Sequence, residues 1–480
     1  MPKYASPILL LSILLCSACA PFAPTQTIAP EVQLQKPYSI QVTGETTNAL
    51  WWKNFNSKEL NALITRALSE NFTIHAAYAR LKQAHAQLER AGAGQYPTLN
   101  LIGNAKAGRT GVKANSSQSG LYDDTQQYRL GAAAAYELDL WGRIEAQRNA
   151  SEQKLYASQA DLDAAAVTVA ASVATTWVDL LRVREEIAIL NEQVENNKKQ
   201  LTFQELRFEN GLAQSVDVLQ QRQILASSQS ELPLLVAKEQ VLLNALAVLI
   251  GSTPLDEPEI TQKKLPELIQ LPTTGLPADL LANRPDVRSA GFVLFSARWN
   301  VAEARANRLP QLTLNADAAL NSSVAAVLFN NWAATLAGNI VQSVLDGGVR
   351  ASEVARTRAL VEEKAATYSL TVSKAIQEVE DALVNEEQQQ QYIKLLSAQR
   401  NATAKTLEDA QLRYLQGQSG YLPLLQEILN VQRLERSMIK QQAELIKFRI
   451  SLYRALGGSW TYGLADVHES FPKDDNTEGI

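Results

Sequence analysis

The sequence predicts an α+β membrane protein built from two copies of one large unit, in which very long helices are combined with pairs of alternating strands. Two long stretches, Arg143 to Asn210 and Val349 to Gln416, contain neither glycine nor proline. The glycines at 142, 211 and 251 recur at 348, 417 and 457 with one constant offset, which indicates an internal duplication. Segments of strict apolar and polar alternation lie between the helical blocks.

The composition limits the classes of protein to consider. A chain of 480 residues is too long for one compact core, so several domains or one repetitive architecture are expected, and the duplication favours the second. The formal net charge is only −5, with 20% charged residues of both signs interspersed. A nucleic-acid partner is excluded on this ground, because such a protein needs a basic face.

The first residues read as a secretory signal, with Lys3 followed by an apolar run. Ser17-Ala18-Cys19 resembles a bacterial lipobox, although Cys16 stands where leucine is usual. We therefore predict a lipoprotein signal peptide over 1–18, acylation of Cys19 and a tether over 19–56. Ala20 in place of an aspartate fits sorting to the outer membrane. The alternative is an ordinary signal peptide that is cleaved near Ala20.

The long stretches predict continuous helices, since Ala, Gln, Glu, Leu and Arg dominate them. Each helix would be roughly 100 Å long. Apolar residues such as Leu162, Val169, Leu180 and Val194 follow heptad spacing, with one stutter. Gly211 and Gly417 are predicted as αL caps, after which return helices run over 212–250 and 418–456.

Four segments predict strands. Residues 128–138 and 312–320 alternate strictly, and their expected partners are 98–108 and 332–344. Loops are expected at 111–124 and 321–331. No run of 18 apolar residues follows position 19, so a membrane crossing is expected to use strands rather than helices. Four short strands cannot close a barrel, so several chains would have to share one.

The remaining boundaries follow from the repeat. The first copy is predicted over 57–251, a proline-rich linker over 252–275, the second copy over 276–457 and a tail over 458–480. Each copy is expected to begin with one helix, Ser57 to Ala91 and Leu276 to Asn307, directly before its strands.

This order of elements resembles the outer-membrane factor family, the TolC-like channels, and in particular its lipoprotein branch. The motifs that carry the resemblance are Trp51-Trp52-Lys53-Asn54-Phe55, Tyr136 to Arg143, Asn283-Arg284-Pro285-Asp286-Val287, Leu345-Asp346-Gly347-Gly348 and the two glycine turns. The resemblance implies a homotrimer with a 12-stranded barrel in the outer membrane, continued by a periplasmic tunnel of twelve helices. It also implies a periplasmic adapter and an inner-membrane pump of the resistance-nodulation-division (RND) type as partners.

Residues for catalysis do not form a constellation in the sequence. His75 and His85 are spaced so that they lie on different faces of a helix, and His468 is distant. Gly92-Ala93-Gly94 lacks the strand and helix of a dinucleotide loop. We therefore expect no enzyme activity, no metal and no cofactor. Three functions stay open: a conduit for small-molecule efflux, the duct of a type I protein secretion system, and a membrane-tethered coiled-coil scaffold.

A tunnel through the outer membrane would leak, so we expect its periplasmic end to be closed at the two glycine turns. Candidate gate residues are charged or bulky and lie beside these turns: Arg207, Phe208, Glu209, Asp217, Asp409, Arg413 and Tyr414. They could equally be solvated tip residues, with Arg207 and Arg413 capping helix carbonyls. The resemblance implies an adapter-docking surface at Gly211, Leu212, Ser215, Val216, Leu219 and Gly417. Gly420 and Pro423 predict that the second turn differs from the first.

Overall fold

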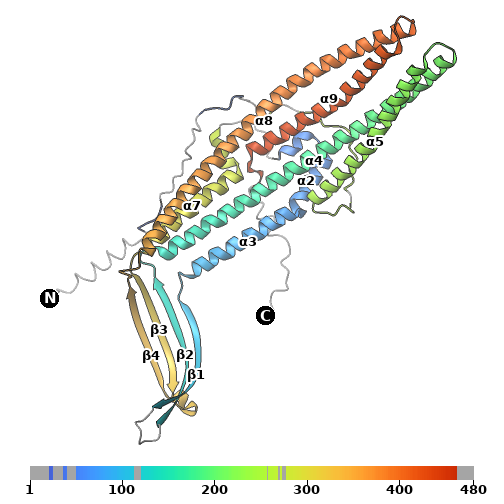
Figure 1. Ribbon diagram of the computed structural model, residues 1–480. Coiled ribbons are helices and arrows are strands. Elements are labelled where there is room, and N and C mark those ends of the chain that lie inside the picture. The colour runs from blue at the N-terminus through green and yellow to red at the C-terminus, as the bar shows by residue number, and fades with distance from the viewer. Residues whose placement is uncertain are drawn as a thin grey trace. The chain divides into compact units, whose positions relative to one another are not determined.

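The computed structural model describes residues 21–24, 36–40, 50–112, 121–256, 258–268, 271–272 and 277–461 (Figure 1). Cys19, the predicted signal peptide and most of the predicted tail lie outside these residues. The chain divides into two compact units. Unit 1 draws on Met1–Ala29, Leu81–Ser158 and Ala290–Tyr368, and unit 2 on Pro30–Arg80, Gln159–Ser289 and Ser369–Ile480. Each unit contains parts of both predicted repeats. The boundaries of the compact units therefore differ from the boundaries of the repeats.

Unit 1 contains a four-stranded antiparallel sheet in the order β1-β2-β3-β4 (Figure 1). The strands are β1 (Thr98–Val112), β2 (Leu121–Leu138), β3 (Gln311–Ser322) and β4 (Trp332–Val341). The predicted strands are confirmed, but their bounds differ. The β1–β2 pairing continues to Val112 opposite Leu121 and takes in part of the predicted loop, whereas β4 ends earlier than predicted. The β2–β3 pairing joins the two repeats within one sheet.

The two longest helices are uninterrupted, as predicted. Helices α4 (Arg143–Glu209) and α8 (Val349–Leu415) each have 67 residues, or about 100 Å at 1.5 Å per residue. Leu162, Leu180 and Val194 of the predicted heptads are buried. The return helices α5 (Ser215–Leu249) and α9 (Tyr421–Leu456) begin three residues later than predicted.

The helices that precede the strands are broken, whereas the sequence predicted continuous ones. The first consists of α2 (Lys58–Glu70) and α3 (Phe72–Ala93). Between them the buried Asn71 accepts hydrogen bonds at Oδ1 from the backbone N–H groups of Thr73 and Ile74, which caps α3. The second consists of η2 (Pro277–Asp279), α6 (Leu280–Asn283) and α7 (Pro285–Ala306). Arg284 interrupts it, because the residue before a proline avoids helical angles.

Two equivalent glycine contacts in unit 2, one from each repeat, show the internal duplication in the structure. Gly251 ends α5 against Glu70, whose carbonyl oxygen would lie 2.2 Å from an added Cβ. Gly457 ends α9 against Asn283 in the same way, at 2.4 Å. Both glycines have positive φ, 78° and 73°. Each return helix therefore ends against the short helix that opens its own repeat, and neither position has room for a side chain.

Segments from near both termini meet in unit 2. Trp51 of η1 (Trp51–Phe55) stacks on Tyr453 at 5.4 Å between ring centres, and Trp52 meets Trp460 of η4 (Ser459–Thr461) edge-on at 4.9 Å. These contacts give the aromatic motif near position 51 a packing role. They fix the start of the first repeat against the end of the second.

Two described helices are long and apolar enough to cross a membrane by length and composition. No run of 18 consecutive apolar residues occurs in either helix, but each contains a largely apolar 18-residue window with at most two charged residues. The window in α4 is 61% buried within the chain, as in the core helix of a soluble protein. The window in α5 is only 17% buried, and its Leu234 and Val241 are exposed.

Candidate functional site: a two-faced sheet and two helical turns

One face of the sheet in unit 1 is apolar and uncovered. Leu101 on β1 and Leu336 and Ile340 on β4 are 85%, 81% and 72% exposed. Trp332 lies on the same face at the hairpin end of β4 and is exposed as well. Tyr122 is also exposed on this face, at the hairpin end of β2, beyond the exposed Arg109–Asp124 ion pair. An apolar band bordered by aromatic side chains is typical of strands that face lipid.

The opposite face of the sheet is polar. The Nη2 atom of Arg129 on β2 lies 2.6 Å from Oδ2 of Asp317 on β3. Asn104 on β1 is opposite Arg129, and Thr335 on β4 is opposite Asp317, so all four strands contribute polar residues here. Alternation of lipid-facing and polar residues is the pattern of barrels that enclose water.

The sheet has two open edges. Among the described residues, β1 and β4 each pair with one neighbour only. Unpaired backbone groups are costly in a bilayer, where water cannot satisfy them. The apolar face can therefore lie in a membrane only if strands from other chains complete the sheet.

The two long hairpins turn at glycines, as predicted. Gly211 and Gly417 have φ of 70° and 72°. In the first turn the N–H of Leu212 donates to the Arg207 carbonyl at 2.7 Å. The second turn repeats this bond from Gln418 to Arg413 at 2.8 Å. Both are the six-residue ring of a Schellman cap, which explains why glycine follows each long helix.

The turns differ in how the return helix begins. In the first, Gln214 and Asp217 form a reciprocal capping box, and the Gln214 N–H donates to the Asp217 carboxylate at 3.0 Å. In the second, Gly420 occupies the cap position without a side-chain bond. The first return helix is thus fixed by its own side chains, and Asp217 is engaged in this structural role.

Arg207 and Tyr414 meet between the two hairpins. The Arg207 guanidinium lies 4.7 Å from the centre of the Tyr414 ring, in cation–π geometry. The Tyr414 hydroxyl donates to Oε1 of the fully buried Gln204 at 2.8 Å, and its ring packs against Tyr421 at 5.5 Å. Tyr414 therefore belongs to the chain's own core and ties α8 to α4.

The other candidate gate residues lie on the surface of this single chain. Arg413 pairs with Asp409 at 2.8 Å within α8, and both side chains are about 60% exposed. Phe208 and Glu209 are exposed at the end of α4. Among the residues that the structure describes, these four form no side-chain hydrogen bond, ion pair or ring contact with Arg207 or Tyr414. They stay available to a neighbouring chain.

The predicted docking residues form an exposed apolar patch at the start of α5. Leu212, Val216 and Leu219 are 64%, 46% and 60% exposed, and Ser215 lies exposed between them. Exposed leucines and valines at helical spacing are typical of a surface that binds another helix.

A polar ladder inside the hairpins was not predicted. The Gln193 side chain donates to the Gln432 carbonyl at 3.1 Å, and Gln432 donates to Oδ1 of Asn197 at 3.1 Å. Tyr421 donates to Gln221 at 2.6 Å. The only sequence signal is the recurrence of glutamine and asparagine at positions that a coiled coil would bury. The ladder specifies register between α4, α5 and α9, because each buried amide needs its partner.

The hairpins also enclose a cavity of about 590 Å³. It lies between α4, α8 and α9, and Gln193, Phe203, Tyr414, Leu424 and Glu435 are among its lining residues. Its lining mixes polar and apolar groups and contains no arrangement of nucleophile and base.

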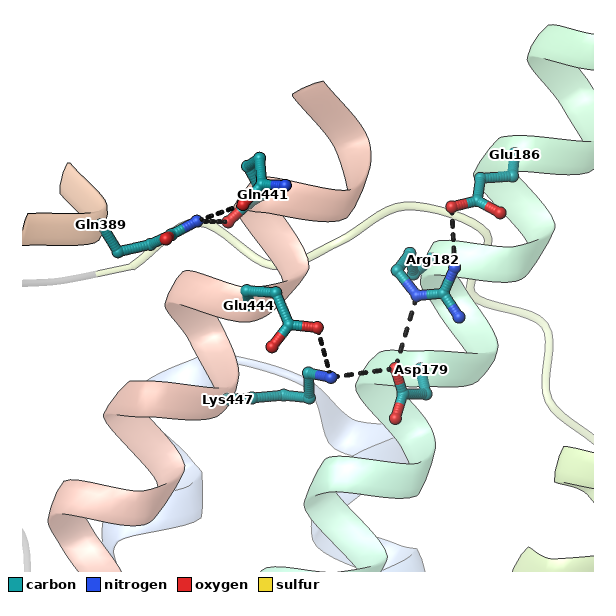
Figure 2. Close-up of polar contacts among 7 residues, drawn as sticks. All are labelled: Asp179, Arg182, Glu186, Gln389, Gln441, Glu444 and Lys447. Carbon is teal, nitrogen blue, oxygen red and sulfur yellow. Dashed lines mark hydrogen bonds and ion pairs between the residues drawn. The ribbon is translucent and has the colours of Figure 1, made fainter. Parts of the chain in front are cut away.

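Farther from the turns, an ion-pair network connects α4 with α9 (Figure 2). Lys447 lies 3.4 Å from Asp179 and 2.6 Å from Glu444. Asp179 also contacts Arg182 at 3.4 Å, and Arg182 pairs with Glu186 at 2.7 Å. Arg182 and Glu186 are nearly fully buried, so their pairing satisfies charges that would otherwise be costly.

Burial and local contacts set the environment of four titratable side chains. Burial raises the pKa of Asp163 to about 6, partly opposed by Arg288 at 3.4 Å. Burial also raises the pKa of Tyr421 to about 12. His75 contacts the Ser69 carbonyl, and His85 lies 3.6 Å from Glu89 on its own helix.

Comparison with known proteins agrees with this architecture. Residues 63–252 and 276–458 match the profile of the outer membrane efflux protein family. The pyoverdine export outer membrane protein OpmQ of Pseudomonas aeruginosa is 31% identical over 85% of this chain and 87% of its own. The solvent efflux pump outer membrane protein SrpC of Pseudomonas putida is 30% identical over 85% of this chain and 87% of its own.

A solved structure of the outer-membrane channel OprN has the same fold. It superposes with a TM-score of 0.83 at 26% identity and covers 92% of this chain and 100% of its own. The family profile covers both repeats, from α2 to the end of α9. This protein therefore belongs to the outer membrane efflux protein family.

Proposed function

We propose that this chain is the outer-membrane component of a tripartite efflux system, a passive conduit through which small molecules leave the cell. The observation that carries the proposal is the two-faced sheet: an exposed apolar face around Leu101 and Leu336, and a polar face around Arg129 and Asp317. Such a sheet suits a wall between lipid and a water-filled lumen. OpmQ and SrpC are named for export of different compounds, and a passive duct needs no dedicated substrate site.

The conduit is proposed to be a homotrimer. Four strands per chain with open edges on β1 and β4 give a 12-stranded barrel when three copies join, and the long helices give a tunnel of twelve helices. Support comes from α5, where Leu234, Val236 and Val241 are 72%, 50% and 63% exposed in the single chain. Burying these side chains between copies would stabilise the assembly by about 25 cal/mol for each Å² removed from water.

An RND-type pump in the inner membrane and a periplasmic adapter are the proposed partners. The adapter is assigned to the patch of Leu212, Ser215, Val216 and Leu219 and to the turns at Gly211 and Gly417. The patch is apolar and exposed, whereas the buried polar ladder behind it would keep the helices in register during docking.

Closure at rest is assigned to the same end of the hairpins. Arg207 and Tyr414 hold the two hairpins of one chain together. Phe208, Glu209, Asp409 and Arg413 are proposed to contact neighbouring chains, and Asp217 to hold α5 in place. Adapter binding would favour an open arrangement that lacks these contacts.

The anchor is proposed to be an acylated Cys19 in the inner leaflet of the outer membrane. Two membrane attachments, acyl chains and barrel, would make binding permanent. Mass spectrometry of the mature N-terminus tests this assignment.

Planar-bilayer recording separates the conduit from a tethered scaffold. Purified protein should produce discrete conductance steps, which a scaffold would not. Export assays in cells that lack the gene separate efflux from type I protein secretion: resistance to small toxic compounds should fall, and secretion of a carrier-dependent protein should be unchanged. The opposite pair of results would refute the efflux assignment.

A further inference from the structure

Three arginines and a phenylalanine line a cavity of about 360 Å³ in unit 1. Arg305 lies at the end of α7, Arg308 follows it, and Arg358 projects from the third turn of α8. Phe22, Leu309 and Val354 complete the lining. The cavity therefore combines positive charge with an apolar floor.

The charge of this cavity is not neutralised by the rest of the described chain. None of the three arginines forms an ion pair with a carboxylate in the described residues. On α8, Glu353, the residue before Val354, pairs instead with Arg356 at 2.7 Å. Glu303 lies in the field of Arg143 and Lys154, with a pKa raised by burial. Three cations around one hollow repel one another unless an anion joins them.

The cavity lies beside the edge of the apolar sheet face. Leu309 and Pro310 directly precede β3, on which Leu312 and Leu314 belong to that face. The Pro310 carbonyl accepts a hydrogen bond from Trp141 Nε1 at 2.7 Å, which fixes the strand entry. In a membrane this edge coincides with the polar headgroup layer, where arginines meet lipid phosphates.

We propose that Arg305, Arg308 and Arg358 bind the phosphate of an anionic phospholipid in the inner leaflet of the outer membrane. The guanidinium groups would donate charge-assisted hydrogen bonds to the phosphate oxygens. Phe22 and Leu309 offer apolar contact to the start of the acyl chains. This inference needs the outer-membrane location of the sheet and is independent of acylation at Cys19, of the adapter and of the gate.

The test uses the full-length protein, purified and stripped of lipid, with phosphatidylglycerol and phosphatidylethanolamine as probes in native mass spectrometry. The parent protein should retain phosphatidylglycerol in preference to phosphatidylethanolamine. Combined substitution of Arg305→Gln, Arg308→Gln and Arg358→Gln should reduce that preference by roughly tenfold or more, since each surface cation contributes about 1 kcal/mol to anionic-lipid attraction. The corresponding lysine variant should keep most of it.

A matched variant, Arg80→Gln with Arg400→Gln and Arg433→Gln, removes the same charge from exposed arginines in unit 2 and should bind as the parent does. An unchanged preference in the first variant, or an equal loss in the matched one, would overturn the proposal. Displacement of phosphatidylglycerol by an equal concentration of inorganic phosphate would also overturn it, since the cavity would then be an anion site without lipid recognition.

Discussion

The guanidinium of Arg207 on α4 lies 4.7 Å from the ring centre of Tyr414 on α8. Arg207 belongs to the first repeat and Tyr414 to the second. The same kind of cap ends both long helices, because the backbone carbonyls of Arg207 and Arg413 each accept the hydrogen bond that closes a glycine turn. Duplication has thus placed two equivalent turns so that a cation of one meets an aromatic ring beside the other.

Loss of the Tyr414 hydroxyl should loosen the hairpin tips. Tyr414→Phe removes the bond to the buried Gln204, a loss of about 1 kcal/mol, so the ratio of open to closed channels should rise about fivefold. Open probability in planar bilayers measures it. Tyr392→Phe, on an exposed part of the same helix, is the control. Equal open probability for parent and Tyr414→Phe would show that this bond does not restrain the gate.

Removing the exposed ion pair on α8 should change channel closure in the assembly more than it changes the stability of the helix. Asp409→Ala with Arg413→Ala deletes a solvent-exposed pair within one helix, which contributes little to helix stability. We therefore expect unchanged thermal stability and a higher conductance. If the doubly substituted protein conducts no better than the parent at low and at high salt, these residues do not close the channel.

A charge in the exposed patch at the start of α5 should abolish adapter binding. Leu219→Glu places a carboxylate in the centre of that patch, and desolvating it on docking is costly. Cells carrying the variant should lose export while the amount of protein in the outer membrane stays constant. Leu395→Glu, at an equally exposed leucine of α8, should export normally. Normal export by Leu219→Glu would exclude this surface.

Removing the acyl anchor should leave the protein in the membrane. Cys19→Ser should give a mature chain without acyl mass, still found in the outer membrane because the sheet holds it. Mass spectrometry and membrane fractionation report both outcomes. A parent chain with an unmodified N-terminus after Ala20 would show that Cys19 is not lipidated.

The buried carboxyl of Asp163 predicts a pH-dependent stability. Its pKa of about 6 in the folded chain exceeds the ordinary value of 3.8, so the folded state binds the proton more tightly than the unfolded state. The protonated Asp163 carboxyl therefore makes its full contribution to the free energy of unfolding below about pH 4, and this contribution is lost as the pH rises through 6. The free energy of unfolding of Asp163→Asn should therefore rise relative to that of the parent over this pH range, by roughly 2 to 3 kcal/mol at neutral pH. Thermal unfolding from pH 4 to 8 measures the difference. Parallel profiles for the parent and Asp163→Asn would contradict the assigned role of burial.

Local signals in the sequence were sufficient for the long elements. The absence of glycine and proline predicted α4 and α8, and Gly211 and Gly417 predicted the turns, because both depend on backbone preferences alone. Alternation predicted the strands for the same reason. Their exact ends depended on pairing across the hairpin, which the sequence of one strand does not contain.

Side-chain partners could not be predicted in the same way. Tyr414 was expected at a surface between chains, and its bond to Gln204 depends on how two helices from different repeats pack. The break at Asn71 was missed because a mid-helix asparagine is tolerated unless its side chain finds N–H groups to cap. The arginine cavity joins residues from Phe22 to Arg358, which only the folded chain brings together.

Topology tests the central claim, that the sheet crosses the outer membrane and the helices extend into the periplasm. Ser323→Cys lies between β3 and β4 and Ser215→Cys at the start of α5, and both positions are exposed. The measurement is labelling of intact cells with a membrane-impermeant maleimide, with lysed cells for comparison. We predict labelling of Ser323→Cys in intact cells and of Ser215→Cys only after lysis. Protection of Ser323→Cys until lysis would contradict the membrane-spanning sheet.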